Sequence, residues 1–273
     1  MAQIAAPLTG RYSAGEAGLA TQIAMITRRN LTVIFRTPQA LLPPLIISVF
    51  FLVIYNSTLG EAAAFLPGLS GNSYLGFILP LSLVSSALSG SSLAAQNLVR
   101  DIESGYFDKL LLTPASRTAL LLGPIVAGGF ILGLQAVFVI AVGLLMGLQS
   151  ATGIAGLLAV IGLAILLGSG FAGFTVSAAL GSGNAAVTQA ASFLFFPLTF
   201  LTASFVPLEL LSGWLKVAAK LNPITYVLEA MRSLLNVGWE MTVLWQGVAA
   251  CLILATAMYA LAVYALRVRT RRK

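Results

Sequence analysis

Side chains that could carry out catalysis or bind a metal ion are scarce in this sequence. The 273 residues include no histidine and one cysteine, Cys251, and only 8% of the residues are charged. No lysine follows a glycine, so the phosphate-binding loop G-x-x-x-x-G-K-[ST] of nucleotide hydrolases is absent. We therefore expect no catalytic residue, no metal site and no cofactor on this chain, and we do not expect the chain itself to be an enzyme.

The densest group of charged side chains lies between Gln96 and Arg117, in the segment QNLVRDIESGYFDKLLLTPASR. Its six charged residues surround an apolar set, which is typical of a short amphipathic helix pair that presents a docking surface. Gly105 would supply the bend between the two helices, and Thr113-Pro114 would end the second. A charged, solvated loop explains the same residues equally well.

A second segment, from Pro207 to Glu240, is too apolar for a free loop and too interrupted for a membrane span. Asn222-Pro223 divides it as a helix start would, with Asn as the N-cap and Pro at the first helical position. We predict two short helices that dip into the outer leaflet and return. Glu229 and Arg232 lie three residues apart on the second helix. They form either a structural ion pair or the polar lining of an exit path.

A third segment, from Leu19 to Arg36, precedes the apolar stretches. Its apolar residues recur at helical spacing, whereas Arg28, Thr32 and Arg36 lie on another face. This pattern predicts an amphipathic interfacial helix on the cytoplasmic leaflet, ended by Pro38. Such a helix either anchors the chain or contacts a cytoplasmic partner.

The elements that position these segments are predicted to be membrane-spanning helices. Residues 118–208 contain no Lys, Arg, Asp or Glu, 59% of the chain is hydrophobic, and the mean hydropathy is +0.97. Because about 20 apolar residues cross a bilayer core, the sequence predicts an all-α integral membrane protein. The six predicted transmembrane helices are residues 40–55, 74–95, 120–145, 154–180, 186–205 and 243–266.

The distribution of basic residues predicts the orientation. Of the 15 basic residues, Lys216, Lys220 and Arg232 lie on one side of the predicted spans, and the others lie on the opposite side. By the positive-inside rule both termini are cytoplasmic, in a multi-pass protein of the inner (plasma) membrane. Topology thus explains the net charge of +7, and we expect no nucleic acid partner. The residues assigned to the cytoplasm are Arg11, Arg28, Arg29, Arg36, Arg100, Lys109, Arg117, Arg267, Arg269, Arg271, Arg272 and Lys273.

Three stretches carry a family resemblance: FRTPQALLPPLI (residues 35–46), ESGYFDKLLLTPASR (103–117) and FVPLELLSGWLKVAAKLNPITYVLEAMR (205–232). They resemble the membrane-spanning permease subunits of type-2 ATP-binding-cassette (ABC) exporters, of the kind found with daunorubicin-resistance and nodulation-factor export permeases. The third stretch is the most specific, and the resemblance covers essentially the whole chain.

The resemblance implies a division of the chain. Residues 1–37 would form a cytoplasmic segment with the amphipathic connecting helix, 38–266 a single six-span transmembrane domain, and 267–273 a basic cytoplasmic tail. Within the domain, 97–114 would be the cytoplasmic coupling helix that seats in the ATPase, and 208–235 the extracellular re-entrant helices. The implied ATPase-coupling residues are Arg100, Asp101, Glu103, Tyr106, Phe107 and Leu110; those of the connecting helix are Arg28, Arg29 and Arg36; those of the re-entrant helices or exit are Trp214, Asn222, Pro223, Tyr226, Glu229 and Arg232.

The function implied by the resemblance is export of an amphiphilic drug, lipid or glycolipid from the cytoplasm or inner leaflet of a prokaryotic cell. ATP and Mg would bind a separate ATPase subunit, present in two copies beside a permease homodimer embedded in membrane lipid. One alternative is a polysaccharide exporter permease of the same family. Another is a passive channel or a membrane scaffold that recruits a cytoplasmic protein through residues 96–117.

Overall fold

The computed structural model describes residues 18–63, 74–202 and 208–271, and every regular element in these ranges is a helix. Five of the described helices are long and apolar enough to cross a membrane. The prediction of an all-α integral membrane protein with several spans is therefore confirmed. These five helices are α2 (Pro38–Ala63), α3 (Tyr74–Glu103), α5 (Arg117–Leu145), α6 (Gly153–Ser182) and α11 (Met241–Arg271).

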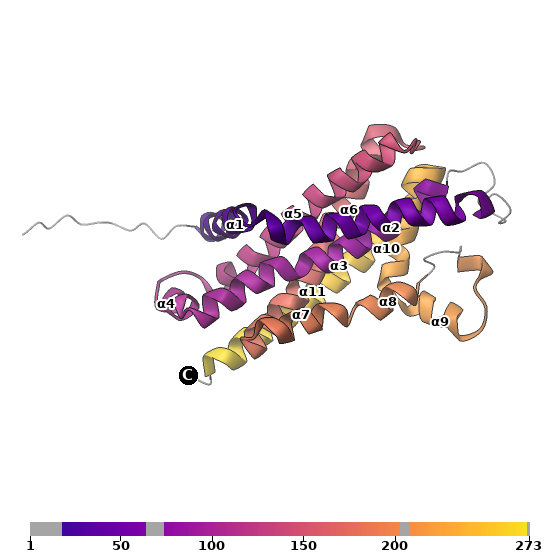
Figure 1. Cartoon of the computed structure of the whole chain (residues 1–273). Helices are drawn as coiled ribbons and strands as arrows, with labels where there is room; N and C mark the ends of the chain where they lie inside the picture. Colours follow the sequence, from indigo (N-terminus) through magenta and orange to yellow (C-terminus); the bar gives the residue numbers. More distant parts are fainter. Residues whose placement is uncertain (1–17, 64–73, 203–207, 272–273) are drawn as a thin grey trace, which may run out of the picture.

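The stretch predicted as one span at residues 186–205 is divided in the structure. It contains α7 (Ala185–Phe193) and the short α8 (Phe196–Phe200), and residues 203–207 lie outside the described ranges. The break has a local cause, because Pro197 lies in the first turn of α8 and has no amide hydrogen to continue the ladder of α7. In Figure 1, α7 and α8 follow one another along the bundle toward α9 (Gly213–Leu221).

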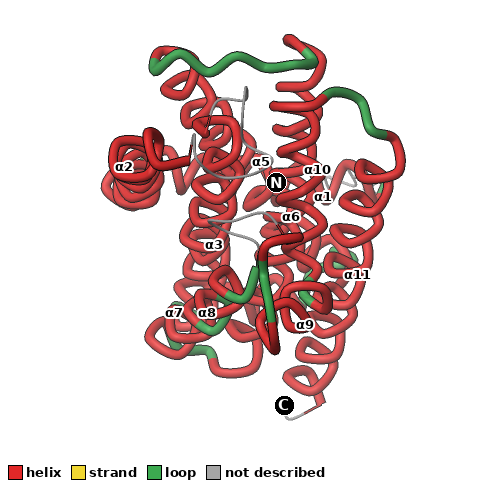
Figure 2. Tube along the Cα trace, turned by 90° about the vertical axis from the view of Figure 1, so that its right-hand side faces the viewer, coloured by secondary structure: helices red, strands yellow, loops and turns green. Residues whose placement is uncertain are grey.

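The centre of the bundle is α3. In its most apolar window 94% of the residues are buried inside the protein, compared with 17% in α2 and in α11. Figure 2 shows α2 at one edge of the bundle and α11 at the other. α3 therefore packs against protein, whereas α2 and α11 present most of their surface to the surroundings.

The two ends of the bundle differ. In Figure 1, α1 (Leu19–Phe35), α4 (Tyr106–Leu111) and the end of α11 lie at one end, which we name the α4 end. At the opposite end, named the α9 end, lies α9, followed by α10 (Pro223–Arg232). The ends of α6 and α11 meet at the α4 end, where Arg269 donates a hydrogen bond of 3.0 Å to the carbonyl of Leu180.

Glycine residues allow the central helices to approach closely. A side chain at Gly133 of α5 would lie 2.8 Å from Ile165 of α6, and one at Gly168 of α6 would overlap Leu132 of α5. Contact through small residues is a common way for helices to pack in membranes. These glycines therefore join α5 to α6 within one chain.

Candidate functional site

The charged segment between Gln96 and Arg117 forms a helix–turn–helix at the α4 end. Helix α3 is continuous through Asn97 to Glu103, so the predicted coupling segment 97–114 is divided between the end of α3 and α4. Between the two helices, Gly105 has a φ of +72°, a left-handed conformation that costs a residue with a side chain about 1–2 kcal/mol. The predicted bend at Gly105 is therefore confirmed.

Phe107 attaches α4 to the bundle. Only 2% of its surface is exposed, and it lies in an apolar cluster with Leu98 and Val99 of α3 and Leu121 of α5. We predicted that Phe107 contacts a partner protein, but its ring is already packed inside this chain. The structure corrects that assignment: Phe107 positions α4 and offers no free surface for docking.

Arg29 links α1 to this turn. Its guanidinium donates hydrogen bonds of 2.6 and 2.5 Å to the two carboxylate oxygens of Asp101, and its central carbon lies 4.4 Å from the centre of the Tyr106 ring. While they are formed, a bidentate ion pair and a cation–π contact together specify both the position and the orientation of the guanidinium. The hydrogen bonds that Arg29 donates to Asp101 raise the pKa of Arg29 above its ordinary value, although burial opposes this change. A residue of the predicted connecting helix thus contacts two residues of the predicted coupling segment.

Further contacts hold α1 against α5. The side-chain carbonyl of Gln22 accepts a hydrogen bond of 2.8 Å from the amide of Ser116, directly before α5. Thr27 donates one of 3.2 Å to the carbonyl of Gly123, and Ile26 packs so closely over Gly123 that any side chain there would overlap it. α1 is therefore attached to α3, α4 and α5 together.

Several side chains of the turn remain available to a partner. Arg100, Glu103 and Lys109 are exposed, Leu110 is half-buried, and 88% of Leu112 is exposed. Sequence reasoning did not single out Leu112 as an exposed apolar residue. The signal was the run of three leucines at 110–112, because Leu112 lies directly after the end of the short α4.

At the α9 end, Asn222 starts α10 as predicted. Its side-chain oxygen accepts a hydrogen bond of 3.0 Å from the amide of Ile224, and Pro223 occupies the first turn. The side-chain nitrogen of Asn222 donates to the carbonyls of Leu198, at 2.7 Å, and Leu201, at 3.1 Å. One side chain therefore caps α10 and also joins it to α8.

The other predicted residues of the α9 end are spread over α9 and α10. The Tyr226 hydroxyl donates a hydrogen bond of 2.8 Å to the carbonyl of Lys220 and so joins α10 to α9. Trp214 is 74% exposed on α9, and Glu229 is half-buried on α10. These side chains are thus distributed over two helices.

Arg232 is buried at the end of α10, with 7% of its surface exposed. Its Nε donates a hydrogen bond of 3.0 Å to the carbonyl of Phe77 in α3, and its guanidinium carbon lies 3.6 Å from the centre of the Phe77 ring. A π-helical turn, η2 (Ser233–Val237), follows directly. This burial favours the structural interpretation of Arg232 over an open polar exit.

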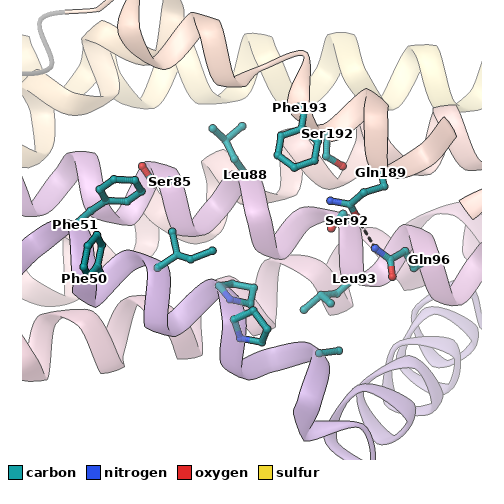
Figure 3. A pocket seen from close by; sticks show the side chains of 14 residues that line it. Phe50, Phe51, Ser85, Leu88, Ser92, Leu93, Gln96, Gln189, Ser192 and Phe193 are labelled. Atoms are coloured by element: carbon teal, nitrogen blue, oxygen red, sulfur yellow. Dashed lines mark hydrogen bonds between the residues drawn. The ribbon is translucent and has the colours of Figure 1, made fainter. Parts of the chain in front are cut away.

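A groove of about 670 Å³ lies between α2, α3 and α7. Figure 3 shows Phe50 and Phe51 of α2 toward one end of it, and Gln96 of α3 with Gln189 of α7 toward the other, joined by a hydrogen bond of 2.6 Å. Phe193 of α7 adds a third aromatic ring. A ligand with an apolar body and a polar end suits this arrangement.

Comparison with known proteins identifies the family. The family described as "ABC-2 type transporter" matches residues 21–236, from α1 into η2. The chain belongs to the ABC-2 type transporter family. All the predicted site residues of this ABC-2 permease lie inside the matched region, and membership implies an ABC partner.

Two relatives of this ABC-2 permease carry names that refer to drug resistance. One is the "Probable doxorubicin resistance ABC transporter permease protein DrrC" of Mycobacterium tuberculosis, 25% identical over 77% of this chain and 75% of the relative. The other is the "Daunorubicin resistance ABC transporter permease protein DrrB1" of Streptomyces coeruleorubidus, 26% identical over 73% of this chain and 69% of the relative. This ABC-2 permease is thus similar to transport subunits over most of its length.

Proposed function

We propose that this permease exports an amphiphilic molecule, such as a drug, a lipid or a glycolipid, from the cytoplasm or the inner leaflet. The energy would come from ATP hydrolysed by separate ABC ATPase subunits. The observation that carries the proposal is the Arg29–Asp101–Tyr106 group, because it joins α1, the end of α3 and α4 into one unit. The exposed charges beside this unit suit a docking partner.

In this proposal, α3 transmits movement of the bound ATPase to the groove between α2, α3 and α7. An ATPase that binds Glu103, Lys109 and Leu112 would move α4 and the end of α3 together, because Phe107 packs α4 onto α3. The same α3 helix contributes Gln96 to the wall of the groove. Movement at the docking surface would therefore change the shape of the groove.

The assembly in this proposal is a permease homodimer with two ATPases. Little of α2 is covered within one chain, and α2 also forms one wall of the groove. A second copy packed against α2 by two-fold symmetry would close the groove between the two permeases. Counting α7 and α8 together as one interrupted crossing gives six spans, with both termini at the cytoplasmic α4 end.

The test of docking is co-purification of the ATPase with the tagged permease from its native membrane. Glu103→Lys should reduce the amount of bound ATPase about tenfold or more, because reversing an exposed interface charge places like charges together. Glu240→Lys makes the same charge change at an exposed position of the α9 end and should leave the amount unchanged. Equal ATPase recovery with both variants would contradict the proposed docking surface.

The test of substrate class uses inside-out vesicles that contain the permease and its ATPase. ATP-dependent uptake of doxorubicin, an amphiphile named in the description of a relative, would support the proposal. Uptake of an oligosaccharide in its place would indicate a polysaccharide exporter. Purification of the permease with a cytoplasmic protein that does not hydrolyse ATP would indicate a scaffold.

A further inference from the structure

The three arginines of residues 19–36, two in α1 and Arg36 directly after it, have different surroundings. Arg29 is paired with Asp101, whereas Arg28 and Arg36 are exposed and make no ion pair within the described part of the chain. Residues 19–36 include no Asp or Glu. Residues 19–36 therefore carry two positive charges that no acidic residue of the same segment balances.

These two arginines border a second groove, between α1 and α5. The groove has a volume of about 810 Å³, and its walls include Ile23, Leu31 and Val126. Its hydroxyl groups are used internally, since Thr27 donates to the carbonyl of Gly123 and Thr32 donates to that of Arg28. The guanidinium groups of Arg28 and Arg36 are thus the polar groups of this groove that remain for a ligand.

The apolar surface of the groove continues along α5. Val126, Phe130, Leu134 and Phe138 are all about half exposed and follow one another at intervals of four residues. Residues with this spacing lie on one face of a helix. The stripe starts at the groove and runs into the apolar span, along the direction that an acyl chain takes in a bilayer.

We propose that the groove between α1 and α5 binds anionic phospholipid, with the acyl chains on the Val126 stripe and the phosphates on Arg28 and Arg36. Guanidinium groups bind phosphate oxygens in pairs, and α1 provides no carboxylate that would compete. Eight residues of helix separate the two arginines by about 12 Å, so each binds its own lipid phosphate. Only the choice of leaflet rests on the proposed orientation, and the cytoplasmic leaflet follows from it.

The experiment measures the thermal unfolding midpoint of the purified full-length permease in a neutral detergent while lipid is added. Phosphatidylglycerol should raise the midpoint by about 5 °C at saturation, and phosphatidylcholine with the same chains should raise it much less. In Arg28→Ala/Arg36→Ala the effect of phosphatidylglycerol should fall to that of phosphatidylcholine. This assay contains no ATPase and measures no transport, and Arg28 and Arg36 do not line the groove between α2, α3 and α7, so the comparison of variants is independent of the proposed export function.

A matched control removes the same charge elsewhere. Arg267→Ala/Arg271→Ala deletes two exposed basic residues near the end of α11 and should retain the full response to phosphatidylglycerol. Ala24→Phe fills the groove without changing the charge and should also abolish the response, since Ala24 lines the groove. If Arg267→Ala/Arg271→Ala loses as much of the phosphatidylglycerol response as Arg28→Ala/Arg36→Ala does, the response reflects general charge attraction. That result would overturn the proposed site.

One further outcome would reassign the two arginines. If Arg28→Ala/Arg36→Ala keeps the wild-type response to phosphatidylglycerol but no longer co-purifies with the ATPase, the face of α1 binds the ATPase and the lipid site is wrong. Wild-type lipid response together with normal ATPase recovery would also overturn the proposal.

Discussion

Two arginine side chains, one near each end of the bundle, attach short helices to the same long helix, α3. Arg29 reaches α3 through the carboxylate of Asp101 and remains partly exposed, whereas Arg232 reaches α3 through the backbone carbonyl and the ring of Phe77 and is buried. A partly exposed ion pair contributes little to stability and can separate and re-form. A buried guanidinium is expensive to displace, because it would lose its partners inside the protein. The comparison indicates an adjustable connection at the α4 end and a fixed one at the α9 end.

Replacement of Arg232 should give the largest effect. Arg232→Ala removes a hydrogen bond from a charged donor and a desolvated cation–π contact, so we expect a loss of about 3 kcal/mol in the free energy of unfolding. In detergent this corresponds to a midpoint about 8 °C lower in a thermal unfolding experiment. Arg232→Lys keeps the charge but loses the planar stacking and should give an intermediate midpoint. An unchanged midpoint in Arg232→Ala would mean that the α9 end is not fixed through this residue.

Asn222 tests the same end with a smaller change. Asn222→Ala removes the cap of α10 and the donor to the carbonyls of Leu198 and Leu201, and should cost about 2 kcal/mol. Asn222→Asp retains the capping oxygen but not the donor, so its unfolding midpoint should lie between those of wild type and Asn222→Ala. If Asp destabilises the protein as much as Ala does, the junction with α8 is the main contribution of Asn222 and the cap is minor.

The Arg29–Asp101 pair should give the smallest change in stability. A double-mutant cycle with Arg29→Ala and Asp101→Ala should yield a coupling energy of about 1 kcal/mol that decreases as salt is added. The same single variants should lower ATP-dependent transport several-fold while changing the unfolding midpoint by only a few degrees, because they weaken the contact between α1 and the turn that joins α3 to α4. A salt-independent coupling energy similar to the effect of Arg232→Ala would remove the distinction between the two ends.

Features that depend on neighbouring residues could be predicted from the sequence. The start of α10 at Asn222-Pro223 depends on one side chain and the amide two residues later, and the bend at Gly105 depends on one residue that tolerates a positive φ. The long apolar helices follow from composition. By contrast, the break between α7 and α8 was missed although Pro197 signals it, because the apolar composition of residues 186–205 masked the effect of one proline.

Features that depend on distant parts of the chain could not be predicted. Arg29 and Asp101 are 72 residues apart in the sequence, and no periodicity relates them. The predicted role of Phe107 failed for a related reason. The burial of Phe107 depends on residues of α3 and α5 that are distant in the sequence or belong to another helix, among them Leu98, Val99 and Leu121. The two grooves likewise could not be predicted, because the walls of each come from separate helices.

One consequence follows from the continuity of α3 between its two arginine contacts. Phe77 and Asp101 are 24 residues apart on a single helix, a distance of about 36 Å along its axis. A tilt of α3 at Asp101 would therefore be transmitted to Phe77 along one continuous helix, without passing through a loop. The position at which this helix bends most easily is Pro80, three residues from Phe77, where one backbone hydrogen bond is missing. Any bending would thus occur beside the contact with Arg232, and the part of α3 from Leu81 to Glu103 would move as one rigid piece.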